Sequence, residues 1–321
     1  MIFGSLAIFL NLMSVMAFSV ILIVTVITAI IKVRDDRPSH YSALARSRIL
    51  WLVALSPWVA GLLAAALALF SGSQYFPVSD LYSFFYWHHY DEFTFNSWHG
   101  ISMTLAVSCT SFLLMKNITR LLINCRQVKL LQAMAEPDIN KFYQLDADAP
   151  TAFTAGYIHP RCYMTTALRR QLNEQEYIII KLHENEHARR LDPLKKWLFQ
   201  TSTSFFPLGA SRHLNQMMVL AMEQCADAAV SHVITDKSLI AKTLLKVKRL
   251  GTVPHQSILD DRAVCHYGSD NISERIGYLL NNDKKKAFPH FRAAMSIVSM
   301  SIICAMSADI LHHAIEYTFF H

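Results

Sequence analysis

The sequence predicts an α-helical membrane protein with four transmembrane helices and a mainly helical α+β domain inserted between the third and the fourth. The composition is the first reason. Only 17% of the 321 residues are charged and 53% are hydrophobic, whereas charged residues make up about a quarter of a typical soluble domain. The second reason is the presence of four apolar runs, each close to the ~20 helical residues that cross a bilayer.

The first apolar run, 2–31, contains no Lys, Arg, Asp or Glu. A signal peptide begins with basic residues and has a shorter apolar core, so we expect this run to remain as the first transmembrane helix. The second and third helices are expected at about 50–70 and 97–115, and the fourth follows the basic residues near the end of the chain, at 293–311.

The predicted spans divide the chain into a membrane domain at 1–116, an inserted domain at 117–290, and a fourth span with a short tail at 291–321. Lys and Arg concentrate in the 32–48 connection and beside the inserted domain, whereas 71–96 has none. Positively charged flanks stay on the cytoplasmic side of a membrane. We therefore expect a multi-pass membrane protein, with the inserted domain cytoplasmic and both termini outside.

The net charge of +6 does not indicate nucleic-acid binding, since no basic run is interleaved with aromatic residues. We attribute this charge to the cytoplasmic flanks of the spans. The six cysteines include no Cys-x-x-Cys pair, which argues against a disulfide framework and against a zinc knuckle.

The inserted domain contains a predicted helix that starts at Asn173. This residue is a good N-cap, and Glu176 three residues later completes a capping box. On the same helix His183 and His187 are four residues apart, so both imidazoles project from one face about one turn apart. That spacing suits two nitrogen ligands of a zinc ion, and Glu184 beside them can act as a general base towards water.

A third ligand is expected from a second helix, at about 213–233. Glu223 lies there, 36 residues after His187, and Asp227 one turn later shares its face. Asp227 could accept a hydrogen bond from a ligand histidine and fix its tautomer. A solvated helix residue is the alternative interpretation of Glu223. Its neighbours are largely apolar, however, and a carboxylate among apolar groups needs a partner or a metal.

Two further groups of residues are weaker candidates. His266 or Tyr267 could stabilise negative charge that develops in a transition state. The stretch 151–158 has strand-like residues between two prolines, and we expect it at the edge of a sheet, where it could bind an extended peptide as an added strand. The residues concerned are Phe153, Thr154, Ala155 and Gly156.

Several stretches together resemble the BlaR/MecR-type integral membrane metallopeptidases, the antibiotic-sensor transducers, which are gluzincins. Four spans with a zinc-protease domain between the third and the fourth are similar to that family's organisation. The matching stretches are Ala152-Phe153-Thr154-Ala155-Gly156 with Pro160-Arg161, Leu172-Asn173-Glu174-Gln175-Glu176, His183-Glu184-x-x-His187 with Arg190-x-Asp192-Pro193, Glu223-x-x-Ala226-Asp227, and Ser273-Glu274-Arg275-Ile276.

The resemblance implies a zincin-like metallopeptidase domain that holds one Zn²⁺ per chain on His183, His187 and Glu223, with Glu184 as the general base. Asp192 and Asp227 are expected to support the ligands. Arg275, in the last of the matching stretches, joins His266 and Tyr267 as a candidate for stabilising the transition state.

The implied function is a membrane-embedded zinc endopeptidase that cleaves a cytoplasmic or membrane-proximal protein, with a transcriptional repressor as the expected substrate. In the antibiotic sensors the fourth span leads to an external penicillin-binding domain, whereas this sequence ends at His321. A signal is therefore expected through 71–96, the spans, a partner membrane protein or an oligomer. Two alternatives are a quality-control protease similar to HtpX and a non-proteolytic, zinc-containing scaffold or receptor.

Overall fold

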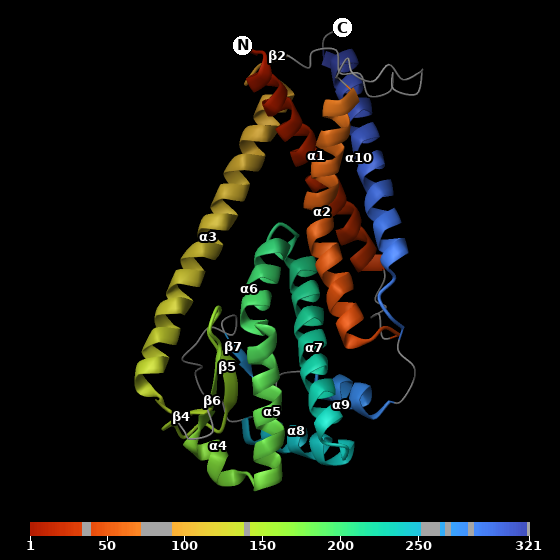
Figure 1. The fold of residues 1–321 in the computed structure, drawn as a ribbon. Helices are drawn as coiled ribbons and strands as arrows, with labels where there is room; N and C mark the ends of the chain where they lie inside the picture. Colours follow the sequence, from red (N-terminus) through yellow and green to blue (C-terminus); the bar gives the residue numbers. More distant parts are fainter. Residues whose placement is uncertain are drawn as a thin grey trace.

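A computed structural model describes residues 1–33, 40–71, 92–137, 142–251, 264–266, 271–281 and 286–319 (Figure 1). Four of its helices are long and apolar enough to cross a membrane, so the prediction of a helical membrane protein with four candidate spans is confirmed. These helices are α1 (Ser5–Val33), α2 (Ala43–Ser71), α3 (Trp98–Met134) and α10 (His290–Phe319).

Helices α1, α2 and α10 pack side by side, and the start of α1 lies at the same end of the bundle as the end of α10 (Figure 1). Small residues permit the close approach of α1 and α2. Ala60 and Ala64 are fully buried, and a Cβ added to Gly61 would lie 3.2 Å from the backbone oxygen of Met16. At the end of the bundle where α1 starts, β1 (Ile2–Phe3) pairs with β2 (Glu92–Phe93).

Helix α3 stands apart from α2 and α10 (Figure 1) and continues well beyond the predicted end of its span at 115, as far as Met134. The extension forms because its sequence suits an amphipathic helix that has a sheet to pack on. Val128 and Leu131 are buried against Phe153 and Tyr163. The third predicted span is therefore the first half of a longer helix that reaches the inserted domain.

The inserted domain combines a small sheet with six helices among the residues that the structure describes. A capping box starts the helix of the His pair as predicted, and the helix of Glu223 begins earlier than predicted, at Leu208. The elements are β3 (Glu136–Pro137), β4 (Phe142–Leu145), β5 (Ala152–Ala155), β6 (Arg161–Thr165), α4 (Thr166–Gln171), α5 (Glu174–Arg190), α6 (Asp192–Thr203), α7 (Leu208–Val233), α8 (Lys237–Gly251), β7 (Val264–His266) and α9 (Ile272–Leu280).

The sheet has the strand order β3-β4-β6-β5-β7. The prediction that β5 is an edge strand is wrong, because β7 pairs antiparallel with its outer side and sets Ala155 opposite Val264. On its other side β5 forms a hairpin with β6. Gly156 in the connection has φ +107°, and a Cβ there would lie 3.0 Å from the backbone oxygen of His159, so the turn requires glycine.

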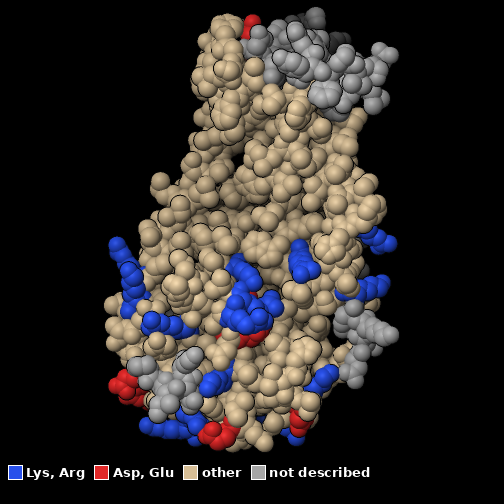
Figure 2. Space-filling view, viewed as in Figure 1, with Lys and Arg blue, Asp and Glu red and all other residues tan. Residues whose placement is uncertain are grey.

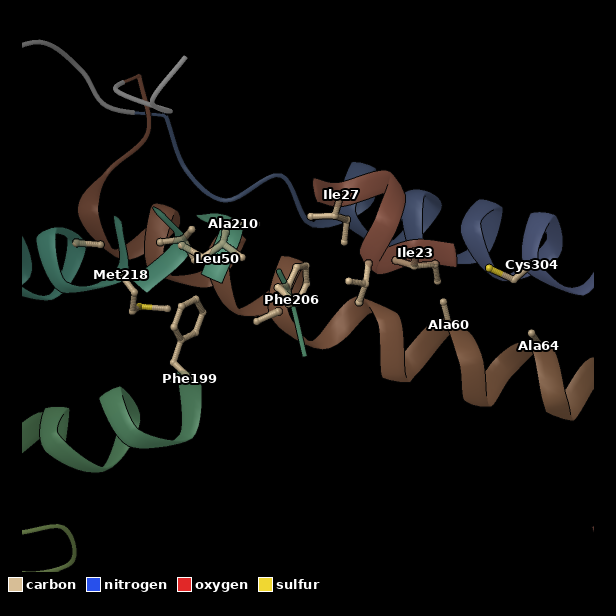
Figure 3. Close-up of a cluster of buried hydrophobic side chains, with 14 of the residues drawn as sticks. Ile23, Ile27, Leu50, Ala60, Ala64, Phe199, Phe206, Ala210, Met218 and Cys304 are labelled. Carbon is tan, nitrogen blue, oxygen red and sulfur yellow. The ribbon is translucent and has the colours of Figure 1, made fainter. Parts of the chain in front are cut away.

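One buried hydrophobic cluster joins the membrane helices to the inserted domain (Figure 3). Ile23 of α1, Ala60 of α2 and Cys304 of α10 belong to it, together with Phe199 of α6 and Met218 of α7. A second cluster holds the sheet, α5, α8 and α9 together. The α6–α7 hairpin therefore packs on the bundle itself.

Lys and Arg are distributed unevenly along the molecule. Figure 2 shows that, on the face in view, they gather over α4–α9 and the adjoining ends of the long helices, while the remaining length of the helices is free of them. We call the end of the bundle that adjoins α4–α9 the charged end. An apolar belt bounded by basic residues on one side is what a bilayer requires.

Candidate metal centre

Helix α5 places both histidines in the interior of the inserted domain. Its first turn is held by the predicted capping box, in which the Glu176 backbone N–H donates to Asn173 Oδ1 at 2.8 Å and the Asn173 N–H donates to Glu176 Oε2 at 3.0 Å. The helix ends at Leu191, which adopts a left-handed conformation with φ +55°. Between these ends His183 and His187 are fully buried.

Helix α7 brings Glu223 to the same point. The Nε2 atoms of His183 and His187 are 3.1 Å apart, and Glu223 Oε2 and Oε1 lie 3.4 Å and 3.6 Å from them, respectively. A tetrahedral zinc ion with bonds of about 2.0–2.1 Å has ligand atoms about 3.3 Å apart. The three predicted ligands therefore converge with the spacing that one metal ion needs.

Each histidine has a carboxylate behind its other ring nitrogen. His183 Nδ1 lies 3.1 Å from Asp227 Oδ1, and His187 Nδ1 lies 2.7 Å from Asp192 Oδ2. A carboxylate can hold a proton on the Nδ1 atom that faces it, which leaves each Nε2 as the atom directed at the centre and available to a metal ion. Asp192 and Asp227 were both predicted to support the ligands, and they lie where that role requires.

Arg275 of α9 lies behind the ligands. Its Nε and Nη2 donate to the two oxygens of Asp227, both at 2.8 Å, and its Nη1 lies 2.9 Å from Glu223 Oε2. The guanidinium is fully buried. Arg275 was predicted to stabilise a transition state. In the structure its guanidinium contacts the carboxylates of Glu223 and Asp227 and neutralises their negative charge.

The charges of this group shift its pKa values strongly. Burial raises the pKa of both Glu223 and Asp227, but Arg275 and the adjacent histidines outweigh burial and hold both pKa values well below the usual carboxyl range. Burial lowers the pKa of His183, but Asp227 and Glu223 raise it to about 9. Both carboxylates are therefore ionised at neutral pH, as cation ligands must be.

Glu184 is fully buried beside the ligands and is oriented by the sheet. The Thr154 hydroxyl lies 2.7 Å from Glu184 Oε2 and 2.9 Å from the Glu184 backbone oxygen. Oε1 has no hydrogen-bond partner among the described residues. Burial raises the pKa of Glu184, and His187 and His183 oppose this. A carboxylate with one oxygen fixed and a raised pKa is suited to general-base work.

The remaining candidates are placed differently. Of the β5 residues, only Thr154 contacts the centre, whereas Phe153 stacks on Tyr163 with ring centroids 5.3 Å apart. The backbone of His266 lies in β7 opposite Phe153. Tyr267 lies outside the described residues.

Sequence reasoning missed the contact of Thr154 with Glu184 and the neutralising role of Arg275. The sequence does contain a sign that Arg275 is buried, since Arg275 lies on the apolar face of a short helix between Ile272 and Leu279. The contact of Thr154 with Glu184 has no such sign, because nothing in a strand of small and aromatic residues indicates which hydroxyl will face a helix.

Two imidazole nitrogens and one carboxylate oxygen form the donor set of many catalytic zinc sites. His183, His187 and Glu223 offer ligand atoms that all lie within 4.8 Å of one another. The residues therefore fit a zinc ion, with Asp192, Asp227 and Arg275 around them. No protein-family model matches the chain, and no curated protein matches it.

Proposed function

We propose that the protein is a zinc-dependent endopeptidase of the membrane, with His183, His187 and Glu223 as ligands and Glu184 as the general base. The observation that carries the proposal is the joint geometry of these four buried side chains. A structural zinc site is closed by four protein ligands. Among the residues that the structure describes, three candidate ligands meet, and a carboxylate that is not one of them lies beside them.

Zinc bound to these ligands would supply a Lewis acid that polarises the scissile carbonyl and lowers the pKa of water to about 7. Glu184 takes the proton from the attacking water on Oε1 and returns it to the leaving amine. Thr154 keeps the carboxylate in place by its contact with Oε2. Arg275 and Asp227 hold Glu223 and His183 in position during the reaction.

The BlaR/MecR-like stretches support this proposal, since several of the residues that they share with that family, His183, His187 and Glu223 among them, converge in space. We further propose the cytoplasmic side of a bacterial inner membrane for the domain, on the basis of its basic flanks. A regulatory substrate such as a repressor fits this location, as does a membrane protein in quality control. A zinc-containing scaffold or receptor would need no carboxylate in the position of Glu184.

Comparison of wild type with a Glu184→Gln variant tests the proposal. Both are purified from membranes and analysed for zinc, and new protein N-termini are compared in cells that express each. Loss of a general base lowers the rate by about 10²–10⁴-fold, so the variant should keep one zinc per chain and lose the cleavage products. Products that persist in the variant would exclude Glu184 as the base.

Glu186→Gln is the matched control. Glu186 lies two residues further along α5, and its carboxylate pairs with Arg189 at 2.7 Å and 2.8 Å. The same chemical change there removes an ion pair that solvent screens and that therefore contributes little to stability. This variant should retain both zinc and cleavage.

A further inference from the structure

The α6–α7 hairpin ties the metal centre to the membrane helices. Its tip, residues 204–209, connects the two helices that carry Asp192 and Glu223, and Figure 1 shows it rising from the inserted domain between α3 and α2. Phe206 in the tip and Ala210 of α7 are buried in the same cluster as Ile27 of α1 and Leu50 of α2 (Figure 3). The hairpin is therefore built into the bundle.

Contacts with α2 show how far the hairpin rises. Trp51 packs edge-to-face on Phe199, with ring centroids 5.3 Å apart, and Trp58 does the same with Phe205 at 4.8 Å. Trp58 lies ten residues beyond Arg48, the last charge on α2, which is about 15 Å along a helix. On this side the tip reaches the apolar length of α2.

Helix α3 gives a second measure of how far the tip rises towards the membrane. Asn117 donates to Ser204 Oγ at 3.2 Å, and Asn117 lies next to Lys116, the first charge after the third apolar run. On this side the tip lies at the boundary between the apolar and the charged part of the helix. The tip therefore lies within the apolar length on the α2 side and at the membrane face of the charged end on the α3 side.

The tip has the chemistry of this location. No Lys, Arg, Asp or Glu lies between Lys196 and Arg212, and Leu208 is 77% exposed at the tip itself. Parts of the turn bond internally, since the Ser204 N–H and hydroxyl both donate to the Thr201 oxygen, at 3.2 Å and 2.7 Å. Pro207 brings no N–H. Such a turn costs less in apolar surroundings than one with free donors.

The metal centre lies a short distance below this face. The sulfur of Met218 accepts a hydrogen bond from Ser47 of α2 at 3.5 Å, and Glu223 follows five residues later, about 8 Å along α7. On the other arm Asp192 precedes Phe199 by seven residues, about 10 Å along α6. Ser204, which marks the boundary on the α3 side, lies twelve residues beyond Asp192, about 18 Å along α6. An extended peptide rises about 3.3 Å per residue, so about three residues span the gap from the level of Met218 and about six span it from Ser204.

We propose that the centre acts on polypeptides anchored in the membrane, at peptide bonds within about three to six residues of the point where the chain leaves the bilayer. This inference rests on the proposed peptidase function and names its substrate class. The hairpin fixes the centre at that height, and anchoring raises the effective concentration of a nearby segment to the millimolar range. A freely diffusing protein gains nothing from this placement.

The proposal is tested by measuring how fast the same set of peptides is cleaved when the peptides are free and when they are anchored to the membrane through a short or a long linker. Wild-type protein in phospholipid vesicles receives random ten-residue peptides that are free, or joined to a polyleucine transmembrane helix through four or through thirty Gly/Ser residues. We expect the four-residue form to be cleaved about tenfold faster or more than the free peptides, and the thirty-residue form to fall between them. Equal rates for the free and the four-residue forms would overturn the proposal.

The height of the hairpin is tested without any cleavage. A photoreactive benzoylphenylalanine at position 208 should cross-link to radiolabelled phospholipid in these vesicles. The matched control is position 280, where Leu280 of α9 is 51% exposed on the inserted domain, and its cross-linking to lipid should be at least about tenfold weaker, since apolar groups at the interface enter the acyl boundary. Lipid labelling that is equal at both positions would overturn the placement. Absence of all cleavage together with strong labelling at position 208 would instead overturn the peptidase function.

Discussion

His183 and His187 lie one turn apart on α5, yet the carboxylates behind them have different origins. Asp192, behind His187, is five residues away and begins the next helix. Asp227, behind His183, comes from α7 and is itself held by Arg275 of α9. The His187 support is thus local in the chain, whereas the His183 support is assembled from two other helices, α7 and α9.

The two supports also differ in charge compensation. Asp227 shares a two-point contact with a fully buried guanidinium, at 2.8 Å for both bonds. Asp192 has Arg190 Nε at 3.5 Å, and the Arg190 side chain is 17% exposed. Both aspartates are buried. The support from a distant helix is compensated by a fully buried guanidinium, whereas the local support pairs with a guanidinium that solvent still reaches.

The largest expected effect is that of Arg275→Met. It leaves Glu223 and Asp227 as buried carboxylates without their cation, and removal of one partner of a buried ion pair costs about 3–5 kcal/mol. The metal-free variant should unfold at clearly lower denaturant concentration in detergent. Arg190→Met is the control for the other support and should cost about 1 kcal/mol or less. Equal losses would show that the two supports do not differ.

Zinc affinity separates the two aspartates next. Loss of a carboxylate behind a ligand histidine weakens metal binding by about 10–100-fold. We expect Asp227→Asn near the upper limit, because it also leaves the charge of Arg275 uncompensated close to the ion, and Asp192→Asn near the lower limit. Competition with a chromophoric chelator measures both. The reverse order would contradict the assignment of Arg275 as the counterion.

Thr154→Val addresses the support of Glu184, which comes from the sheet. The change keeps the shape and removes the hydroxyl, so we expect about tenfold slower cleavage, which corresponds to a hydrogen bond to a charged group of roughly 1.5 kcal/mol. Zinc affinity should stay within about twofold, because no ligand is touched. Thr154→Ser, which retains the hydroxyl, should recover most of the rate. A loss of zinc in the valine variant would place Thr154 among the ligand supports.

The smallest effect is expected at the corner between α5 and α6. Leu191 adopts the left-handed conformation with φ +55°, which costs a residue with a Cβ about 1 kcal/mol relative to glycine. Leu191→Gly should therefore raise the free energy of unfolding by about 0.5–1 kcal/mol, with unchanged zinc affinity. Leu191→Ala, which keeps the Cβ, should not. Weaker zinc binding in the glycine variant would mean that the leucine side chain itself positions Asp192.

The parts of the centre that depend on local spacing were predictable. The capping box at Asn173, the pair of histidines four residues apart, and Glu223 with Asp227 one turn later all follow from helical periodicity. The four membrane helices followed from their apolar length. In each case the information lies within one element.

The parts of the structure that depend on contacts between distant elements were not predictable from the sequence. Strand β5 has the residues of an edge strand, and only the three-residue β7, more than 100 residues later, covers its outer side. The start of α6 at Asp192 depends on Leu191, whose left-handed backbone ends α5 and caps α6 at the same residue. The length of α3 depends on the sheet that its second half meets.

The hydrophobic cluster shared by α6, α7 and the bundle bears on the order in which the molecule can assemble. Residues 192–233 are synthesised before α10, yet the cluster contains Cys304 and Ala308 of α10. Because N-terminal parts of a chain fold first during synthesis, the α6–α7 hairpin can dock against α2 before the membrane bundle is complete. The last helix then completes the cluster by packing on α1 and α2.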